Sequence, residues 1–476
     1  MVDIVLVQPK IGDMDSFRTK PILPLSLLHS ACLVDKEFSV KLIDQRVDSN
    51  WKTTLKKSLD NSLLVATTSM TGPQIKHALE VSKFVKQCSD VPVVWGGVHA
   101  SLLPEQTVSN DYVDIVVQGE GEETLLELAN ALDRNVSLGE VRGLYYKDNG
   151  KVRYTGYRNF VNLNRLPDVP YHLVNVRNYL PIYNRKKSVA MQTSRGCCLN
   201  CHYCYNTVFN RQQWRSLSAE KVVDNAKYLV ENFGVEDIYF VDDNFFVDFE
   251  RARKIASGLA KIGVEWQVQG VTVSDVLKMS YEYLSFLERS GLIRITIGAE
   301  SGSDRIRKLI GKPEPVSQVL EVNRKLSAFN IRVFYSFITG FPTETREDLK
   351  KTISLVFKII SENKNARTSP IYNFIPYPGT RMAEFTKKYG FKQPSCLEEW
   401  ASFSWDNVNV PYIKNKQMFK NLYFSSIFLD NKFKEYETSP IIKLLSYFYK
   451  PFARFRVKHL FFRLMVENLV REVFIK

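Results

Sequence analysis

Three cysteines within one short segment carry the most specific chemical signal in the sequence. Residues 193–206 read TSRGCCLNCHYCYN, so Cys197, Cys201 and Cys204 form a C-x3-C-x2-C array. Three thiolates from one loop can hold three irons of a cubic [4Fe–4S] cluster, which leaves the fourth iron open to a small molecule. A fourth cysteine ligand would close the cluster, whereas a C-x2-C pair would indicate zinc or a redox dithiol. We interpret Cys198 as a bystander; a chance cluster or a zinc loop is the alternative.

The neighbouring residues place this segment at the end of a β-strand. Residues 188–192 have the pattern of a buried strand, and Gly196 permits the tight turn at which the loop begins. Tyr203 precedes the last cysteine and is expected to place a flat aromatic ring beside the cluster.

Six strand–helix repeats begin with this strand. The strands are expected near residues 188–192, 237–241, 264–268, 293–298, 332–338 and 370–375. Apolar residues recur at helical spacing between them, and Ser218, Gly263 and Thr345 stand where helices would begin or end. Such repeats predict a partial (β/α)6 barrel, with function at the carboxyl ends of its strands.

Several residues at these strand ends are expected to bind the molecule that the open iron takes. Buried carboxylates need partners, and an amine on that molecule would supply one, although helix capping is the alternative for Asp243. The candidates, in chain order, are Asp242, Asp243 and Gln267.

The cysteine array and these strand ends resemble the radical S-adenosylmethionine (SAM) enzymes. The resemblance implies that the amino and carboxylate groups of SAM chelate the open iron. It also implies that one electron, delivered by an external donor of the flavodoxin or ferredoxin type, cleaves SAM to a 5′-deoxyadenosyl radical. Glu300 and Ser301 match the family position beside the methionine or ribose part of SAM, and Ile338 and Pro376 match the adenine side. Tyr377 is the candidate catalytic residue because it can face the substrate.

Residues 1–150 predict a separate α/β domain. Short apolar strands are expected at 4–7, 40–43, 63–67, 91–95 and 115–117, and helical patterns separate them. This alternation predicts a doubly wound, Rossmann-like parallel sheet that binds its ligand at the carboxyl ends of the strands. The candidate ligand-binding residues there are Thr68, Ser69, Met70, Thr71, Gly72, Gly96, Gly97, His99, Gly119 and Glu120. A G-x-G-x-x-G motif is absent, so a dinucleotide is not favoured.

Residues 70–80, 95–106 and 111–121 look like the cobalamin-binding domain that precedes the radical barrel in one subclass of the family. This resemblance implies cobalamin as methylcobalamin. The D-x-H-x-x-G loop, whose histidine ligates cobalt in many cobalamin proteins, is absent, so the lower axial ligand is unassigned. His99 is the candidate for that ligand, and hydrogen bonding near the corrin or the sheet edge is the role that we expect instead. A sheet that binds nothing is the alternative.

Bulk properties favour a cytoplasmic protein that does not bind nucleic acid. Seven cysteines, an odd number, indicate a reducing compartment, and the start of the chain lacks the pattern of a signal peptide. The net charge of +14 is concentrated at one end, because residues 411–476 hold 13 Lys and Arg against 5 Asp and Glu. The rest of the chain is nearly balanced, which argues against a nucleic-acid footprint.

Residues 396–476 are predicted to form a basic, aromatic helical extension, with two amphipathic helices separated at Pro451. We expect the aromatic side chains to cover the barrel or the domain junction. Contact with a membrane surface or with an acidic partner is the alternative. Residues 1–150 and 186–395 are then the cobalamin-binding domain and the barrel, joined by a linker at 151–185.

These features together predict a cobalamin-dependent radical SAM enzyme, with methyl transfer to an unactivated carbon as the leading reaction. The substrate would be a small or lipid-like molecule. Two alternatives stay open: a non-methylating cyclase, rearrangement or oxidoreductase enzyme that uses the same cofactors, and a non-catalytic protein that binds the cluster or the corrin.

Overall fold

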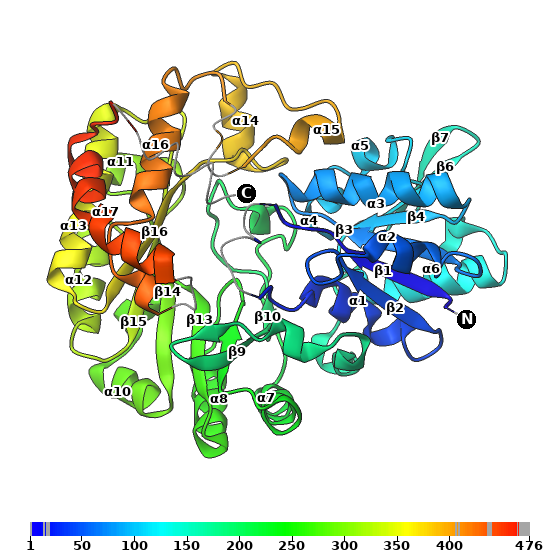
Figure 1. The fold of residues 1–476 in the computed structure, drawn as a ribbon, viewed down its shortest axis with the longest axis horizontal. Helices are drawn as coiled ribbons and strands as arrows, with labels where there is room; N and C mark the ends of the chain where they lie inside the picture. The colour runs from blue at the N-terminus through cyan, green and yellow to red at the C-terminus, as the bar shows by residue number, and fades with distance from the viewer. Residues whose placement is uncertain are drawn as a thin grey trace. The chain divides into compact units, whose positions relative to one another are not determined.

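The computed structural model describes residues 2–12, 15, 20–404, 407, 410–435, 440–463 and 465. The chain divides into two compact units, which are coloured by residue number in Figure 1. Unit 1 consists of Met1–Tyr179 and Lys392–Phe403, and unit 2 of Leu180–Phe391 and Ser404–Lys476. A short segment that follows the barrel in the sequence thus belongs to the N-terminal unit.

Unit 1 is built on a seven-stranded sheet with the strand order β2-β1-β3-β4-β5-β6-β7. The first five strands are parallel, while β6 and β7 are antiparallel at one edge. The strands are β1 (Ile4–Gln8), β2 (Val40–Asp44), β3 (Leu64–Thr68), β4 (Val93–Gly96), β5 (Ile115–Val117), β6 (Leu144–Asp148) and β7 (Lys151–Tyr154). All five predicted strands are therefore present in a doubly wound arrangement, as expected.

Helices cover both faces of this sheet. They are α1 (Leu25–Val34), α2 (Trp51–Lys56), α3 (Gln74–Cys88), α4 (Gly97–Leu102), α5 (Pro104–Val108), α6 (Glu122–Asp133) and, from the returning segment, α15 (Leu397–Trp400). Ile4 and Leu6 of β1 face a core that α1 and α6 complete. On the other face, the Trp95 indole of β4 donates a hydrogen bond to Ser82 of α3 at 2.8 Å. Because successive side chains of a strand point to opposite faces, side chains of β1 and β4 contribute to a hydrophobic core on each face of the sheet.

The predicted linker contains regular structure in its first and last parts. Strand β7 closes a hairpin at Asn149 and Gly150, and three single turns follow at Leu163–Arg165, Tyr171–Leu173 and Val176–Tyr179. Strand β8 (Ile182–Tyr183) then opens unit 2 by pairing with β9.

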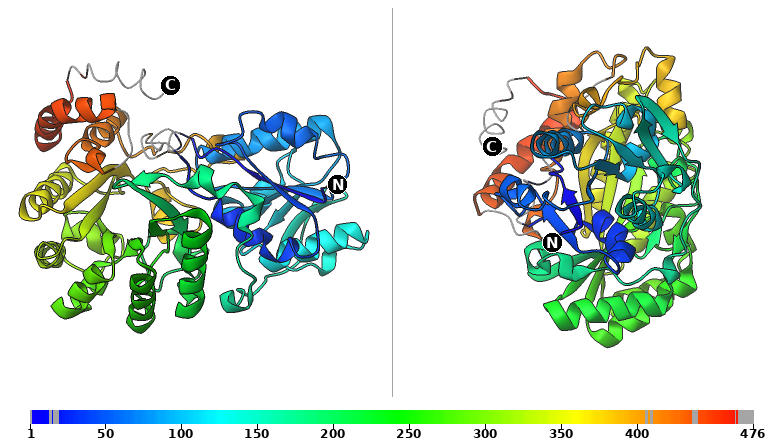
Figure 2. Two further views of the ribbon diagram at one scale, coloured as in Figure 1. Left: turned by 60° about the horizontal axis from the view of Figure 1, so that its bottom comes forward. Right: turned by 90° about the vertical axis from the view of Figure 1, so that its right-hand side faces the viewer.

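Unit 2 is a curled half-barrel sheet with helices along its outer side (Figure 2). The strand order is β16-β15-β14-β13-β12-β9-β8, and all strands from β9 to β16 are parallel. The parallel strands are β9 (Lys186–Met191), β12 (Asp237–Phe240), β13 (Glu265–Val271), β14 (Leu292–Glu300), β15 (Arg332–Thr339) and β16 (Ala366–Asn373). A two-stranded ribbon, β10 (Ser194–Arg195) with β11 (Arg215–Ser216), follows β9.

The outer helices begin and end where the sequence predicts. The Ser218 hydroxyl caps α7 (Ala219–Phe233), Gly263 ends α8 (Phe249–Ile262) at a φ of 79°, and Thr345 with Asp348 forms a capping box on α13 (Arg346–Glu362). The other helices of unit 2 are α9 (Val273–Lys278), α10 (Tyr281–Arg289), α11 (Asp304–Leu309), α12 (Val316–Leu326), α14 (Arg381–Lys387), α16 (Lys416–Ser426) and α17 (Pro440–His459).

The last barrel strand starts four residues earlier than predicted. Its start at Ala366 places Pro370 inside the strand, which is possible because β16 is an edge strand. Side chains from the following segment occupy the exposed edge: Asp430 accepts a hydrogen bond from the Thr368 amide and Ser426 from the Ile371 amide, both at 2.8 Å. The extension thus closes an edge that would otherwise expose unpaired amides.

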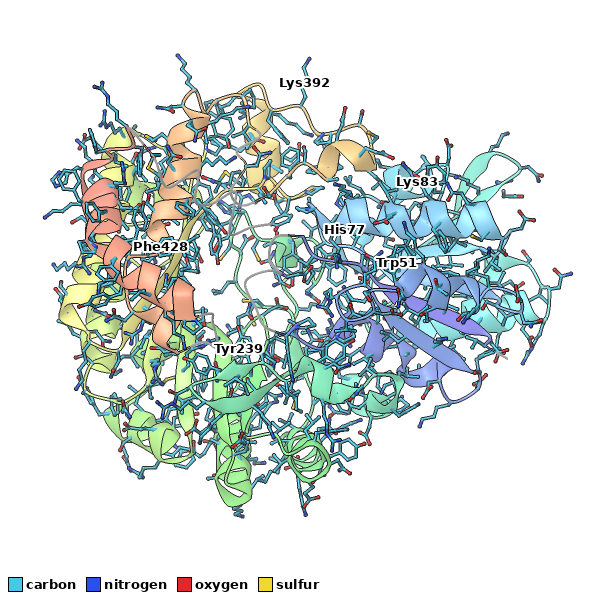
Figure 3. All side chains as sticks on the ribbon, viewed as in Figure 1. Trp51, His77, Lys83, Tyr239, Lys392 and Phe428 are labelled. Atoms are coloured by element: carbon cyan, nitrogen blue, oxygen red, sulfur yellow. The ribbon has the colours of Figure 1, made fainter. Side chains whose placement is uncertain are left out.

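One continuous helix, α17, spans the region where two helices separated at Pro451 were predicted. Helix α17 runs through Pro451, whose side chain is exposed, so water can replace the hydrogen bond that proline cannot donate. On its inner face, Tyr449 packs edge-on against Phe428 with ring centroids 5.2 Å apart. Phe428 is labelled in Figure 3. Most aromatic side chains of α17 nevertheless point away from the barrel, contrary to expectation. Within the described residues, no helix is long and apolar enough to cross a membrane.

Candidate active site

The three-cysteine loop leaves the carboxyl end of β9, the first parallel strand of the half-barrel. At Gly196 the backbone has a φ of +84°, and a Cβ there would lie 2.0 Å from the Gln213 carbonyl oxygen. Only glycine therefore fits this turn. Cys197, Cys201 and Cys204 are free thiols, and Cys201 is buried.

Two carboxylates at the end of β12 hold this loop in place. Asp242 is 1% exposed and accepts hydrogen bonds from the Thr193 amide, the Thr193 hydroxyl and the Ser194 hydroxyl at 2.5–2.7 Å. Asp243 accepts from the Gly196 amide at 2.9 Å and from the Tyr205 hydroxyl at 3.0 Å. The carboxylates thus bind the cysteine loop itself, and Asp248, not Asp243, caps the following helix.

We expect Asp242→Ala to destabilise the protein without cluster by about 3 kcal/mol, because it leaves three buried donors unpaired. It also removes the carboxylate beside Arg251, whose guanidinium donates to the Thr193 carbonyl at 2.9 Å. Urea unfolding measures this change. Asp248→Ala is the control: it removes only a helix cap and should cost about 1 kcal/mol. Equal losses in the two variants would contradict the anchoring role of Asp242.

Asn244, two residues after Asp242, was missed by the sequence analysis. Its side-chain amide lies 3.9 Å from the Cys197 sulfur, and its backbone carbonyl accepts a hydrogen bond from the Trp214 indole at 2.8 Å. Asn244 can therefore donate to the sulfur of a bound cluster, one of the contacts that set the potential of such clusters. Its position at the end of a barrel strand is the sequence feature from which Asn244 could have been predicted.

A buried charged network lies beside Cys201. Glu300 ends β14 with a φ of 60°, which is unusual for a residue with a side chain, and the Lys312 ammonium lies 3.7 Å from its carboxylate. The Lys312 ammonium also donates to the Gly298 carbonyl at 3.3 Å. Burial lowers the pKa of Lys312, but the charges of Cys201, Glu300 and a neighbouring glutamate outweigh burial and raise it overall.

Arg307 and Glu314 complete this network, and neither of them, nor Lys312, was predicted from the sequence. Arg307 is 1% exposed; its guanidinium lies 3.4 Å from the Glu314 carboxylate and also donates to the Ala299 carbonyl. On the other side, Tyr203 hydrogen-bonds Glu300, and burial followed by the Glu300 charge raises the pKa of Tyr203. No local sequence pattern identified Arg307, Glu314 or Lys312, because their partners lie on other elements.

The residues of the loop fit an iron–sulfur cluster. Burial raises the pKa of the Cys204 thiol to about 12, so a metal ion is needed to keep this sulfur deprotonated near neutral pH. Among the described residues, no three His, Cys, Asp or Glu side chains form a site for a single metal ion.

Two other predicted SAM contacts, Gln267 and Ser301, form hydrogen bonds within the half-barrel. Gln267 is the third residue of β13 and donates to Asp237, the first residue of β12, so both lie toward the amino ends of the strands. Burial raises the pKa of Asp237 to about 7. Ser301 is fully buried and hydrogen-bonds Thr352 of α13 at 3.2 Å. In the structure both side chains stabilise the barrel.

The remaining predicted residues of unit 2 follow the last strands. Ile338 and Tyr203 pack against one apolar cluster that includes Phe341. Pro376 is buried, and the Tyr377 ring lies near enough to Tyr205 to contribute to the raised pKa of that phenol, after burial and Asp243. The structure therefore brings Tyr377 toward the loop that holds the cysteines.

In unit 1, the predicted ligand-binding residues meet at the carboxyl ends of β3 and β4. Gly97 has a φ of +88°, and a Cβ there would lie 2.4 Å from the Thr68 hydroxyl and 2.9 Å from the Ser69 amide. The Ser69 hydroxyl is buried and has no hydrogen-bond partner among the described residues. We call the backbone turn at Gly96 and Gly97 the glycine cradle. This turn and the unpaired Ser69 hydroxyl fit a large ligand that approaches the backbone closely.

His99 has the second of its expected roles, hydrogen bonding at the sheet edge. It is fully buried, and its Nδ1 lies 3.0 Å from the Thr71 hydroxyl. Burial lowers the pKa of His99 to about 3, so the ring is neutral. Trp400 of α15 covers it edge-on, with ring centroids 5.6 Å apart. The tryptophan comes from the returning segment, so no local pattern could identify this contact.

The other candidates of unit 1 differ in their surroundings. Met70 is 43% exposed, and its amide donates to Gln74. At Gly72 a Cβ would lie 2.5 Å from the Phe403 carbonyl oxygen, so the returning segment requires glycine there. Gly119 has a φ of +88° and open space on its Cβ side, whereas Glu120 accepts a hydrogen bond from the Val161 amide at 2.9 Å.

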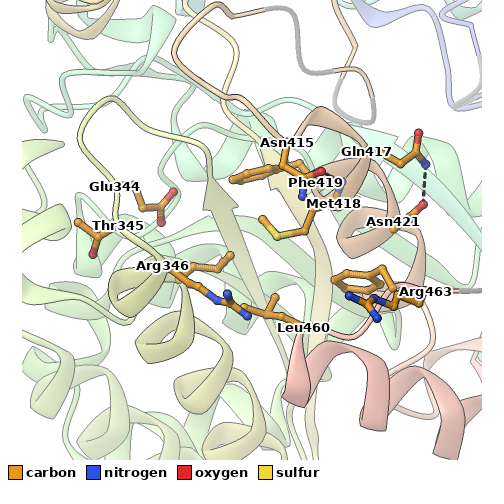
Figure 4. Close-up of a pocket in the computed structure, with 12 residues that line it drawn as sticks. Glu344, Thr345, Arg346, Asn415, Gln417, Met418, Phe419, Asn421, Leu460 and Arg463 are labelled. Atoms are coloured by element: carbon orange, nitrogen blue, oxygen red, sulfur yellow. Dashed lines mark hydrogen bonds between the residues drawn. The ribbon is translucent and has the colours of Figure 1, made fainter.

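A cavity of about 430 Å³ in unit 2 lies apart from the cysteine loop. Figure 4 shows it between the start of α13, the start of α16 and the residues that follow α17. Its lining contains none of the predicted site residues. We therefore place the candidate active site at the cysteine loop, where the chemistry-bearing side chains converge.

The fold and the site define a class of protein. A half-barrel that carries a three-cysteine loop after its first parallel strand has the parts of an enzyme with an open iron–sulfur cluster. The doubly wound unit supplies a second ligand-binding fold.

Comparisons with known proteins agree with this class. The radical SAM superfamily model matches residues 191–356, and the B12 binding domain model matches residues 26–129. An uncharacterized methyltransferase of Pyrococcus horikoshii is 31% identical over 370 residues, which cover 76% of this chain and 78% of the relative. The cytidylyl-2-hydroxyethylphosphonate methyltransferase of Streptomyces wedmorensis is 25% identical, over 71% of this chain and 68% of the relative.

A solved structure shares the fold over both units. The cobalamin-dependent S-adenosylmethionine radical enzyme OxsB, with aqua-cobalamin and SAM bound, matches with a TM-score of 0.72 at 19% identity, over 99% of this chain and 75% of that one. The chain therefore belongs to the radical SAM superfamily and carries a B12 binding domain. Its cofactors are a [4Fe–4S] cluster, SAM and cobalamin, as predicted.

Proposed function

We propose that this enzyme transfers a methyl group to an unactivated carbon of a small-molecule or lipid-like substrate. The observation that carries the proposal is the anchored cysteine loop at a half-barrel strand end, in a chain that also has a B12 binding domain. Methyl transfer is favoured because two relatives that share most of this chain are named methyltransferases.

Cys197, Cys201 and Cys204 are proposed to hold the cluster. Asp242 and Asp243 fix the backbone of their loop, and Asn244 donates to a cysteine sulfur. When bound, the cluster supplies the electron that cleaves SAM to a carbon radical, and cobalamin supplies the methyl group. The protein's task is to place these groups and to exclude water from them.

Lys312 and Glu300 are proposed to bind the charged end of SAM. The ammonium of Lys312 is nine-tenths buried and has one carboxylate partner among the described residues, so it can also attract the SAM carboxylate. Glu300 carries the opposite charge that suits the SAM ammonium. Tyr377 is proposed to face the substrate, and Tyr203, Ile338 and Pro376 to form apolar walls for the rest of SAM.

The glycine cradle of unit 1 is proposed to hold the corrin. Gly96, Gly97 and Gly119 let the backbone approach the ring, and the Ser69 hydroxyl offers a hydrogen bond that the protein leaves unused. An external one-electron donor, of the flavodoxin or ferredoxin type, is required to reduce the cluster. We also propose a cytoplasmic location, because all seven cysteines are free thiols.

The first test is cofactor content followed by product analysis. The chain is purified without oxygen from cells supplied with iron and cobalamin, reduced with dithionite and incubated with SAM whose methyl group is deuterated. A small-molecule extract serves as the substrate source. We expect roughly four irons and one cobalt per chain, release of both 5′-deoxyadenosine and S-adenosylhomocysteine, and a deuterated methyl group on a metabolite.

Other product patterns would contradict the proposal in different ways. Formation of 5′-deoxyadenosine without S-adenosylhomocysteine would indicate a non-methylating radical enzyme. Unchanged SAM with a fully loaded and reduced cluster would indicate a protein that binds its cofactors without catalysis.

A further inference from the structure

Helix α17 carries an exposed apolar stripe that the proposed reaction does not use. The stripe consists of Leu444, Tyr447, Phe448, Phe452 and Phe455, which are between 55% and 66% exposed. Leu444, Phe448, Phe452 and Phe455 recur at intervals of three or four residues along one face of the helix, and Tyr447 precedes Phe448 beside them. Aromatic and leucine side chains so exposed along one helix face mark an interaction surface.

The opposite face of α17 is already packed against unit 2. Ala453 and Val457 are fully buried, and the Arg454 guanidinium lies 5.3 Å from the centre of the Phe357 ring of α13. Tyr449 lies against two phenylalanines of the segment around α16. The helix is thus held by one face, and the stripe is directed away from the protein core.

The charged residues in the sequence around the stripe are all basic. No Asp or Glu occurs from Thr438 to Val466, and this stretch contains six Lys and Arg residues. Lys443 and Lys458 are exposed on the described part of the helix. An apolar stripe flanked by cations is the pattern of a helix that lies in the interface of a membrane.

We propose that α17 docks the enzyme on an anionic phospholipid membrane, with the stripe inserted at the level of the lipid headgroups. Burial of the aromatic side chains supplies the hydrophobic part of the binding, and each lysine or arginine near the surface adds attraction to anionic lipid. This arrangement keeps α17 parallel to the surface and requires no crossing of the bilayer.

The charge pattern favours a lipid surface over a second copy of the chain. Two stripes packed against each other would bring together two sets of cations, Lys443 and Lys458 among them, in a stretch without Asp or Glu. The cationic surface also continues past the helix, because Arg346 and Arg463 line the cavity of Figure 4 beside Leu460 and Phe462. Glu344 is the one carboxyl group in that lining, and burial raises its pKa to about 7.

The test is sedimentation of the full-length protein with vesicles at 0.15 M salt. We expect binding to vesicles of equal parts phosphatidylglycerol and phosphatidylcholine to exceed binding to pure phosphatidylcholine by a factor on the order of 10 to 100. The triple variant Phe448→Ser, Phe452→Ser, Phe455→Ser should weaken binding to the anionic vesicles by roughly 100-fold. The matched control is Tyr228→Ser, Tyr281→Ser, Tyr389→Ser, which removes three exposed aromatic side chains from other parts of unit 2 and should leave binding unchanged.

Three results would overturn the proposal: no binding to anionic vesicles, undiminished binding by the stripe variant, or equal losses in both variants. A dimer seen by light scattering, dissociated by the stripe substitutions, would make a second copy the occupant of the stripe. The proposal does not depend on methyl transfer, since vesicle binding is measured without SAM, and either proposal can fail while the other holds.

Discussion

Replacement of Cys201 by alanine is expected to abolish cluster assembly and all cleavage of SAM. Cys201 is the buried member of the C-x3-C-x2-C array, and a cubic cluster held by two thiolates would leave two irons without a protein ligand. Iron analysis of protein reconstituted without oxygen should fall from roughly four irons per chain to near zero. Production of 5′-deoxyadenosine should fall below detection in the same sample.

Cys198→Ala is the matched control for this experiment. Cys198 lies in the same loop but is exposed, so its removal should change neither iron content nor SAM cleavage. Normal iron content in the Cys201 variant, or loss of iron in the Cys198 variant, would overturn the assignment of ligands. Urea unfolding of both variants without iron separates a lost ligand from a misfolded loop.

Gly97→Ala is expected to have the largest effect on cobalamin binding. The added methyl group would lie 2.4 Å from the Thr68 hydroxyl, and an L-residue at a φ of +88° is strained in addition. Relief of this clash must move the ends of β3 or β4, where the corrin is proposed to bind. We expect cobalamin affinity to fall by at least an order of magnitude, which corresponds to about 1.4 kcal/mol or more.

Gly150→Ala separates the clash from the backbone strain. Gly150 lies in the same unit with a φ of +76°, and no atom comes within 4 Å of its Cβ position. Its alanine variant should therefore lose a similar amount of stability through backbone strain but bind cobalamin normally. Titration of both proteins with aquacobalamin, followed by absorption, measures the difference. Equal affinity in the two variants would contradict a corrin site at the Gly97 turn.

The charged residues around the cysteine loop show why a site is harder to predict than its ligands. Asp242 and Asp243 were recognised as strand-end carboxylates, yet they were expected to bind SAM or cap a helix. In the structure they accept hydrogen bonds from the cysteine loop, about fifty residues earlier in the chain. A strand end predicts where a side chain lies, whereas its partner depends on which loop passes beside it.

Site residues that come from distant segments of the chain could not be predicted from the sequence. Lys312 precedes helix α12 in the sequence, and its ammonium lies beside the Glu300 carboxylate at the end of β14. Trp400 contacts His99 from a segment that follows the whole barrel. Neither stands in a motif. Lys312 is recognised as a site residue because it is a buried cation beside a carboxylate, and Trp400 because it is a fully buried tryptophan. Both features become visible only in the packed structure.

The sequence by itself determined the features whose physical cause is local. The cysteine spacing, the glycine at the tight turn, the helix caps and the two alternating strand–helix patterns each depend on a few neighbouring residues. The tertiary structure decided the partners of the buried charges and the direction in which α17 faces. Helical periodicity could not settle that direction, because both Phe452 and the buried Val457 are apolar. Only the surface against which the helix packs distinguishes them.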